Sequence, residues 1–124
     1  IVAGLQLTDT SPLDVTDGIF FLKADGAATI SFIVEKDSTQ STLTLPNSLA
    51  DDTFMTLGFV YDPKDQKFHV FQNNVLAGTV VSTNAPDNEE LALSFGIQNG
   101  AAAAKTLTVD YIGASKERTA NTEL

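Results

Sequence analysis

The sequence predicts an all-β protein with the architecture of an antiparallel β-sandwich or jelly roll. Short apolar or alternating runs recur along the whole chain of 124 residues. Clusters of Asp, Asn, Gly and Pro separate these runs and are typical of turns between strands. About nine runs follow one another at regular spacing, and no segment predicts a helix. Many short strands joined by regular turns favour two stacked sheets.

The first half of the chain contains four predicted strands. In the third strand, alternation puts Phe32 and Val34 on one face, and Ile33 interrupts the pattern. Asp25-Gly26 precedes that strand and favours a tight hairpin turn, because both residue types tolerate positive φ. The four strands cover residues 1–7, 18–23, 28–35 and 41–45.

The strongest strand signal is a three-stranded meander in the middle of the chain. Its first strand is almost wholly apolar, which predicts a central strand covered on both faces. Pro63 presets φ in the turn that follows, and Asn73-Asn74 supplies a two-residue reversal before the third strand. The three strands cover residues 54–61, 67–72 and 75–81.

Two further strands are predicted on either side of the Asn99-Gly100 turn, at residues 91–98 and 106–112. Apolar residues alternate with polar ones in both. The alanine run 101–104 between them is too short to nucleate a helix without packing partners.

The chain becomes polar from Ser115 onward. We therefore expect a β-sandwich domain over residues 1–114 and a polar C-terminal tail, mobile or bound to a partner, over 115–124.

The chain is strongly acidic, with sixteen acidic and seven basic residues and a formal net charge of −9. Such a surface repels phosphate backbones and anionic lipid, so nucleic acid and membrane are poor partners. No apolar run approaches the roughly 20 residues that span a bilayer. The chain contains no cysteine, which excludes disulfides and thiolate metal sites. Cytosolic assembly is therefore slightly favoured.

The meander resembles a known fold family, the concanavalin A-like and laminin G-like jelly rolls. In that family an apolar strand ending in Tyr-Asp is followed by a short turn, a second strand and a short third strand containing glycine. The segments that carry this likeness are residues 56–62, 67–74 and 75–79.

Together with the meander, three other segments are similar to a group of tailed-phage virion proteins, the capsid decoration or minor head proteins with this fold. The segments are residues 17–21, 94–100 and 105–112, and the likeness covers roughly residues 5–118. The resemblance implies a structural, non-enzymatic protein of the virion capsid surface, assembled in the host cytoplasm. Its implied partners are the major capsid protein or other virion proteins, and a homo-oligomer such as a trimer is compatible with it.

The family also has N-terminal strands with no counterpart in this sequence. We therefore expect the fold to lack those strands and its first strand to present an unpaired edge, which another chain would cover. The candidate interaction residues are two at that edge and three aromatics whose facing the pattern leaves open: Ile1, Val2, Phe20, Phe21 and Phe71.

The sequence offers no catalytic constellation. His69 is the only histidine, so no triad or metal cluster can include a second one. A glycosidase needs two carboxyl groups about 5–10 Å apart across a cleft, whereas the acids here lie mostly in turns, and only Glu35 and Asp110 lie within predicted strands.

Six aromatic residues are assigned to the core by alternation: Phe32, Phe54, Phe59, Phe68, Phe95 and Tyr111.

A carbohydrate-binding, lectin-like module of a fibre or adhesin is the alternative function. Such sites combine an exposed aromatic ring with Asp and Asn hydrogen bonds, often fixed by calcium. Two acidic clusters could surround a hard cation, but neither has the ligand spacing of a known calcium loop. Solvated turns are the favoured interpretation, and no cofactor is expected. The clusters are Asp9, Asp14 and Asp17, and Asp87, Asn88 and Glu89.

Overall fold

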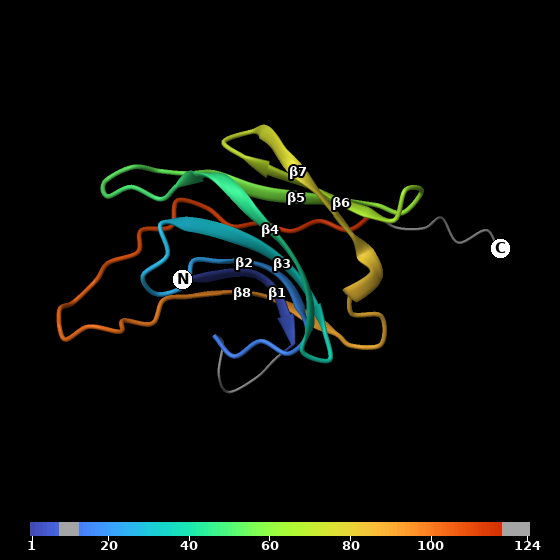
Figure 1. Ribbon diagram of the computed structural model, residues 1–124, viewed down its shortest axis with the longest axis horizontal. Coiled ribbons are helices and arrows are strands. Elements are labelled where there is room, and N and C mark those ends of the chain that lie inside the picture. Colours follow the sequence, from blue (N-terminus) through green and yellow to red (C-terminus); the bar gives the residue numbers. More distant parts are fainter. Residues whose placement is uncertain (8–12, 118–124) are drawn as a thin grey trace.

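The computed structural model describes residues 1–7 and 13–117, and it confirms an all-β protein with two antiparallel sheets (Figure 1). The five-stranded sheet has the order β4-β3-β2-β1-β8, and the three-stranded sheet has the order β5-β6-β7. No helix in the described part of the chain has the length and apolar character needed to cross a membrane. The strands are β1 (Val2–Leu7), β2 (Gly18–Leu22), β3 (Thr29–Lys36), β4 (Thr39–Ser48), β5 (Leu57–Asp62), β6 (Lys67–Gln72), β7 (Val75–Val81) and β8 (Leu91–Gly96), with a 3-10 turn, η1 (Ser82–Asn84), after β7.

The turns form where the sequence supplies residues that tolerate positive φ. Asn73 and Asn74 have φ of 53° and 64°, so the two-residue reversal between β6 and β7 is confirmed. Between β2 and β3 the connection is wider than the predicted tight hairpin. Residues 24–27 form a turn closed by a 3.2 Å backbone hydrogen bond, and only Gly26 within it has a positive φ, of 69°.

The main core lies between the two sheets and is centred on phenylalanine rings. The ring centroid of Phe32 lies 5.1 Å from that of Phe21 and from that of Phe59, and 6.0 Å from that of Phe68. These rings come from both sheets, so they hold the two layers together. The buried members of this core are Ile19, Phe21, Ile30, Phe32, Val34, Leu45, Phe68, Val70 and Val80.

A second, smaller core lies on the other face of the five-stranded sheet. Val2, Phe20 and Ile33 are buried there, against Leu13 and Val15 of the segment between β1 and β2. β3 is thus covered on both faces at Ile33. This explains why an apolar residue interrupts the alternation of the strand there.

The strand predicted at residues 54–61 differs from the observed one. It begins at Leu57, and among the described residues it pairs only with β6, so it is an edge strand. Phe54 is 71% exposed and Val60 is 60% exposed. The prediction of a central strand covered on both faces is therefore wrong, because nothing in this part of the structure covers the outer face of the three-stranded sheet.

The strand predicted at residues 106–112 does not form. This segment belongs to neither sheet, and Tyr111 within it is 74% exposed. An alternating apolar segment becomes a strand only where a neighbouring edge pairs with it, and no described strand does so.

The first strand does not present the expected open edge. β1 lies inside the five-stranded sheet and pairs with both β2 and β8. The Ile1 ammonium group donates to the Lys23 carbonyl oxygen at 2.9 Å, and the Lys23 N–H donates to the Ile1 carbonyl oxygen at 2.8 Å. β8 returns along the other side of β1, so the edges of this sheet are β4 and β8.

Candidate interaction surface

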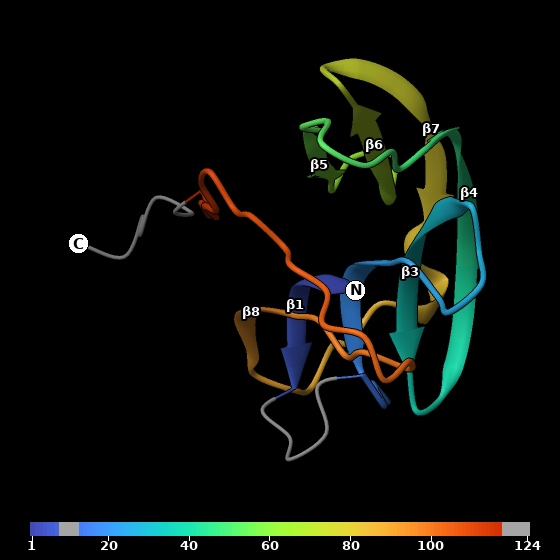
Figure 2. The ribbon, with the colours of Figure 1, turned by 90° about the vertical axis from the view of Figure 1, so that its left-hand side faces the viewer.

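The two sheets differ in width, and the wider one is only partly covered. β7 lies beside β4. From that junction the strands β7-β6-β5 of one sheet and β4-β3-β2 of the other follow one another in the same direction. Figure 2 shows β1 and β8 extending past β5, away from the three-stranded sheet. No described strand lies opposite these two strands, so their inner face lacks the second layer that a sandwich normally supplies.

The inner face of β8 is apolar and exposed. Leu93 pairs with Leu5 of β1, which packs against the main core, so Leu93 and Phe95 point to the inner side. Leu93 is 44% exposed, Phe95 is 52% exposed, and Ile97, just beyond the strand, is 42% exposed. We call Leu93, Phe95 and Ile97 the open face.

The edge of β5 next to the open face has unpaired backbone groups. The Asn73 N–H donates to the Thr56 carbonyl oxygen at 2.8 Å, and hydrogen-bonded pairs alternate along an antiparallel ladder. The N–H groups of Leu57, Phe59 and Tyr61 therefore point away from β6. We call this side of the strand the free edge of β5.

The segment that follows β8 borders the same region. A Cβ atom on Gly100 would lie 3.2 Å from an Asp25 carboxylate oxygen, so the chain passes the β2–β3 turn after leaving β8. It then returns at the level of the three-stranded sheet, on the open side beyond β5 (Figure 2). Within this stretch Val109 is 42% exposed and Ile112 is 42% exposed.

The residues singled out in the sequence lie elsewhere. Val2, Phe20 and Phe21 are 0%, 2% and 6% exposed, so they belong to the cores and contribute nothing to an accessible surface. Ile1 is partly buried beside Lys23. Phe71 is partly exposed on the outer face of the three-stranded sheet, and none of the five belongs to the open face.

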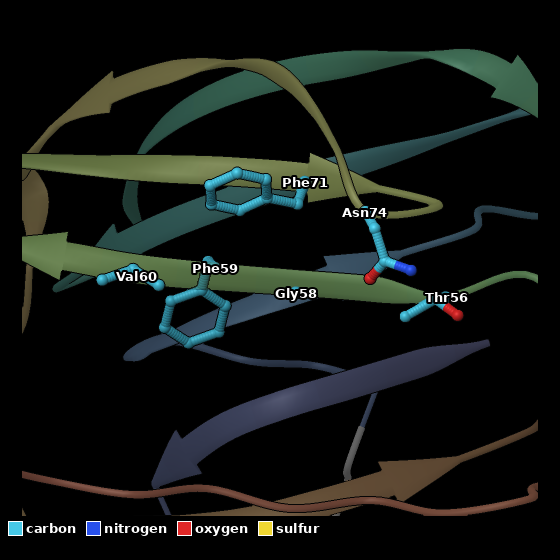
Figure 3. Close-up of a pocket in the computed structure, with 6 residues that line it drawn as sticks. All are labelled: Thr56, Gly58, Phe59, Val60, Phe71 and Asn74. Atoms are coloured by element: carbon cyan, nitrogen blue, oxygen red, sulfur yellow. The ribbon is translucent and has the colours of Figure 1, made fainter.

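A shallow hollow of about 260 Å³ lies on the three-stranded sheet (Figure 3). Gly58 forms part of its floor, and nothing lies within 4 Å of where its Cβ would be. The ring of Phe71 and the side chains of Asn74 and Thr56 border it. This is an aromatic surface beside hydrogen-bonding groups, which is a combination that sugars can use.

Two acidic side chains are buried where β2 meets β3. Asp17 is 8% exposed, and one of its carboxylate oxygens accepts the Asp37 N–H at 3.0 Å. Glu35 is 9% exposed. Burial, followed by the negative charges of Asp17 and Asp14, raises the pKa of Glu35 above its ordinary value. Asp17 thus has a structural hydrogen-bonding role in the β3–β4 turn.

The second predicted acidic cluster and the histidine have ordinary surface partners. A carboxylate oxygen of Asp87 lies 2.7 Å from the Lys36 ammonium nitrogen, which lowers the pKa of that carboxyl group by a hydrogen bond and by charge. Nε2 of His69 lies 4.0 Å from a carboxylate oxygen of Asp62. Asp110 is exposed and belongs to no strand.

Within residues 1–7 and 13–117, no group of three or more His, Cys, Asp or Glu side chains is placed to hold a metal ion. Asp9 of the first acidic cluster, and the end of the predicted tail at 118–124, lie outside the described residues.

Strand alternation wrongly predicted a core position for the most exposed aromatic residues. Phe32, Phe59 and Phe68 do pack there, but Phe54, Phe95 and Tyr111 are 71%, 52% and 74% exposed. Alternation shows which side chains share a face, but it does not show whether a second layer covers that face. No local sequence pattern gives the number of strands on each side of the sandwich, because that number depends on which distant strands pair.

Comparison with known proteins adds no relative: no protein-family model, no curated protein and no solved structure matches this chain.

Proposed function

We propose that this chain is a non-enzymatic structural protein of a phage virion, a decoration or cement protein that docks on the major capsid protein at the capsid surface. The sequence resemblance supports the virion assignment. The observation that carries the docking role is the open face, where three large apolar side chains stand 42–52% exposed beside a strand with an unpaired edge. Contiguous exposed apolar surface is typical of protein interaction sites.

The distribution of acidic groups supports a role without catalysis. Of the two buried carboxyl groups, Glu35 lies on β3 and Asp17 lies just before β2, next to Gly18, which pairs with Glu35; Asp17 orders a turn. They do not face each other across a cleft with room for substrate, as the carboxyl pair of a glycosidase must. Particles assembled in the host cytoplasm would receive this protein at their surface, as a homo-oligomer if it follows the proteins it resembles.

Co-sedimentation tests the proposal. Purified protein would be mixed with shells assembled from the major capsid protein encoded in the same genome. We expect saturable binding in the pellet and a higher disassembly temperature for decorated shells. Saturation at a simple fraction of the capsid subunits would also give the copy number per symmetry position. Shells that neither retain the protein nor gain stability would contradict the cementing role.

A carbohydrate-binding module is the second candidate, and the hollow beside Phe71 favours it specifically. A ring with Asn74 and Thr56 at its border could stack a sugar and bind its hydroxyl groups. A glycan array followed by titration tests this function. Micromolar affinity for one glycan, lost in Phe71→Ala but kept in the matched outer-face variant Leu76→Ala, would establish it in place of capsid docking.

A further inference from the structure

We propose that the chain docks by accepting one extended strand from its partner protein. The added strand pairs with the free edge of β5 and covers the open face. This inference deepens the proposed docking role and rests on it, because it specifies how the partner is held. The partner segment is an extended peptide with alternating apolar residues and basic flanks.

The geometry of the two sheets gives the position of the added strand. β7-β6-β5 lies across β4-β3-β2, so the next position in the three-stranded sheet lies over β1 and β8. A strand placed there accepts hydrogen bonds from the N–H groups of Leu57, Phe59 and Tyr61, which point away from β6. Addition of a strand to an exposed edge is a general mode of peptide recognition.

The side chains on both sides of this position are complementary to an apolar strand. Alternate side chains of the added strand would point toward Leu93 and Phe95 of β8 and toward the half-buried Leu5 of β1. Tyr61, 44% exposed with its ring centroid 4.9 Å from that of Phe68, would gain a neighbour on its open side. The segment 106–112 borders the position on the far side (Figure 2).

The charge distribution favours a different protein, rather than a second copy of this chain, as the partner. The strands that would flank the added segment are uncharged from Leu57 to Tyr61 and from Leu91 to Gly96. Acidic residues outnumber basic ones at both ends: the 62–66 turn and the 85–90 loop at one end hold five acids and Lys64, and residues 49–54 at the other end hold Asp51 and Asp52 (Figure 1). Two copies that each carry −9 repel one another, so the fitting occupant is another protein whose strand is flanked by lysine or arginine.

A synthetic peptide tests the inference directly. In the probe, valine and threonine alternate between two pairs of lysines, and a fluorescent label reports binding to the 124-residue chain by anisotropy. We expect saturable binding that weakens as salt is added, because lysines at the peptide ends interact with exposed carboxylates. A peptide with proline in place of both a central valine and the threonine next to it should not bind, because one of these two N–H groups points to β5 in either strand orientation and proline cannot supply it.

Hydrogen exchange locates the peptide on the protein. In the free chain the amides of Leu57, Phe59 and Tyr61 should exchange faster than those of Gly58 and Val60, which face β6. The bound peptide should slow the first three at least about tenfold and leave the others unchanged. Binding without this protection would overturn the inference.

Two matched substitutions separate the open face from general surface effects. Phe95→Asp places a carboxylate on the open face and should weaken peptide binding at least about tenfold. Leu76→Asp changes an equally exposed apolar residue, 53% against 52%, on the outer face of the three-stranded sheet, and should leave affinity unchanged. Equal effects of the two variants would count against the site. Circular dichroism and melting of each variant show that it folds.

Capsid shells distinguish failure of this inference from failure of the proposed function. If Phe95→Asp loses the peptide but still sediments with shells, docking uses another surface and the inference fails while the function stands. If the peptide slows exchange of the β5 amides in the wild-type chain but the chain does not bind capsid shells, strand acceptance stands and the virion role fails.

Discussion

Glu35 lies on β3 beside Asp17, with both side chains nearly enclosed. A carboxylate in such a place loses hydration and is repelled by its acidic neighbours, so its protonated form is favoured. The raised pKa means that the folded state holds a proton on Glu35 that the unfolded state has already released. Between the ordinary value of 4.5 and the raised folded-state pKa, the free energy of unfolding therefore falls as pH rises.

Glu35→Gln removes the ionisable group while keeping its shape. We expect the variant to lose less stability than the wild type between about pH 4.5 and neutral pH, because no charge is forced into the buried position. Urea denaturation midpoints at the two pH values measure the difference. Glu89→Gln, at an exposed position, should keep the wild-type pH dependence. A Glu35→Gln profile parallel to wild type would show that this carboxyl group is not what couples stability to pH.

β1 and β2 approach each other so closely at Gly4 that a side chain there would clash with the β2 backbone. Gly4 has φ of +154°, and a Cβ atom there would lie 2.5 Å from the Ile19 carbonyl oxygen and 2.6 Å from the Phe20 Cα atom. Both are backbone atoms of β2, which cannot move aside without breaking the ladder. This close approach positions Val2 and Phe20 in the smaller core.

Gly4→Ala should therefore destabilise the protein by about 2 kcal/mol or more. The reason is steric: the new methyl group forces β1 away from β2. Chemical denaturation monitored by far-UV circular dichroism gives the free energy of unfolding. Gly58→Ala is the matched control, because nothing lies within 4 Å of the added methyl group. It should remain within about 0.5 kcal/mol of wild type. Similar losses in both variants would argue against the steric explanation.

In the described part of the molecule, aromatic packing and the buried side-chain amide of Gln72 both link the two sheets. Gln72 of β6 is 2% exposed. Its Nε2 donates to the Asn47 carbonyl oxygen at 2.8 Å, and its Oε1 accepts the Asn47 N–H at 3.0 Å. Because Asn47 belongs to β4, this side chain links the two sheets where β4 and β7 meet.

Gln72→Leu keeps the volume of the side chain but leaves both backbone groups of Asn47 without their partner. We expect a loss of about 1–3 kcal/mol in the free energy of unfolding. The measurement is urea denaturation with fluorescence and circular dichroism, whose transitions should still coincide. Gln40→Leu on the exposed part of β4 should cost less than about 0.5 kcal/mol. A neutral Gln72→Leu would mean that water replaces the amide on Asn47.

The sequence determined much of the fold, because turn chemistry and alternation act over a few residues. The reversal at Asn73-Asn74, the eight strands from 1–7 through 91–98 apart from the shifted start of β5, and the assignment of Phe32 and Phe68 to the core all followed from local patterns. None of these features requires knowledge of which strands become neighbours.

Only the tertiary structure decided which faces are covered. Phe20 and Phe95 occupy similar strand patterns, yet Phe20 is buried under the 13–17 segment and Phe95 stands half exposed beyond the edge of the smaller sheet. Burial depends on how many strands each layer contributes and where each sheet ends, which is a property of pairing between distant segments. The open face and the free edge of β5 follow from that count of strands, which no local pattern in the chain specifies.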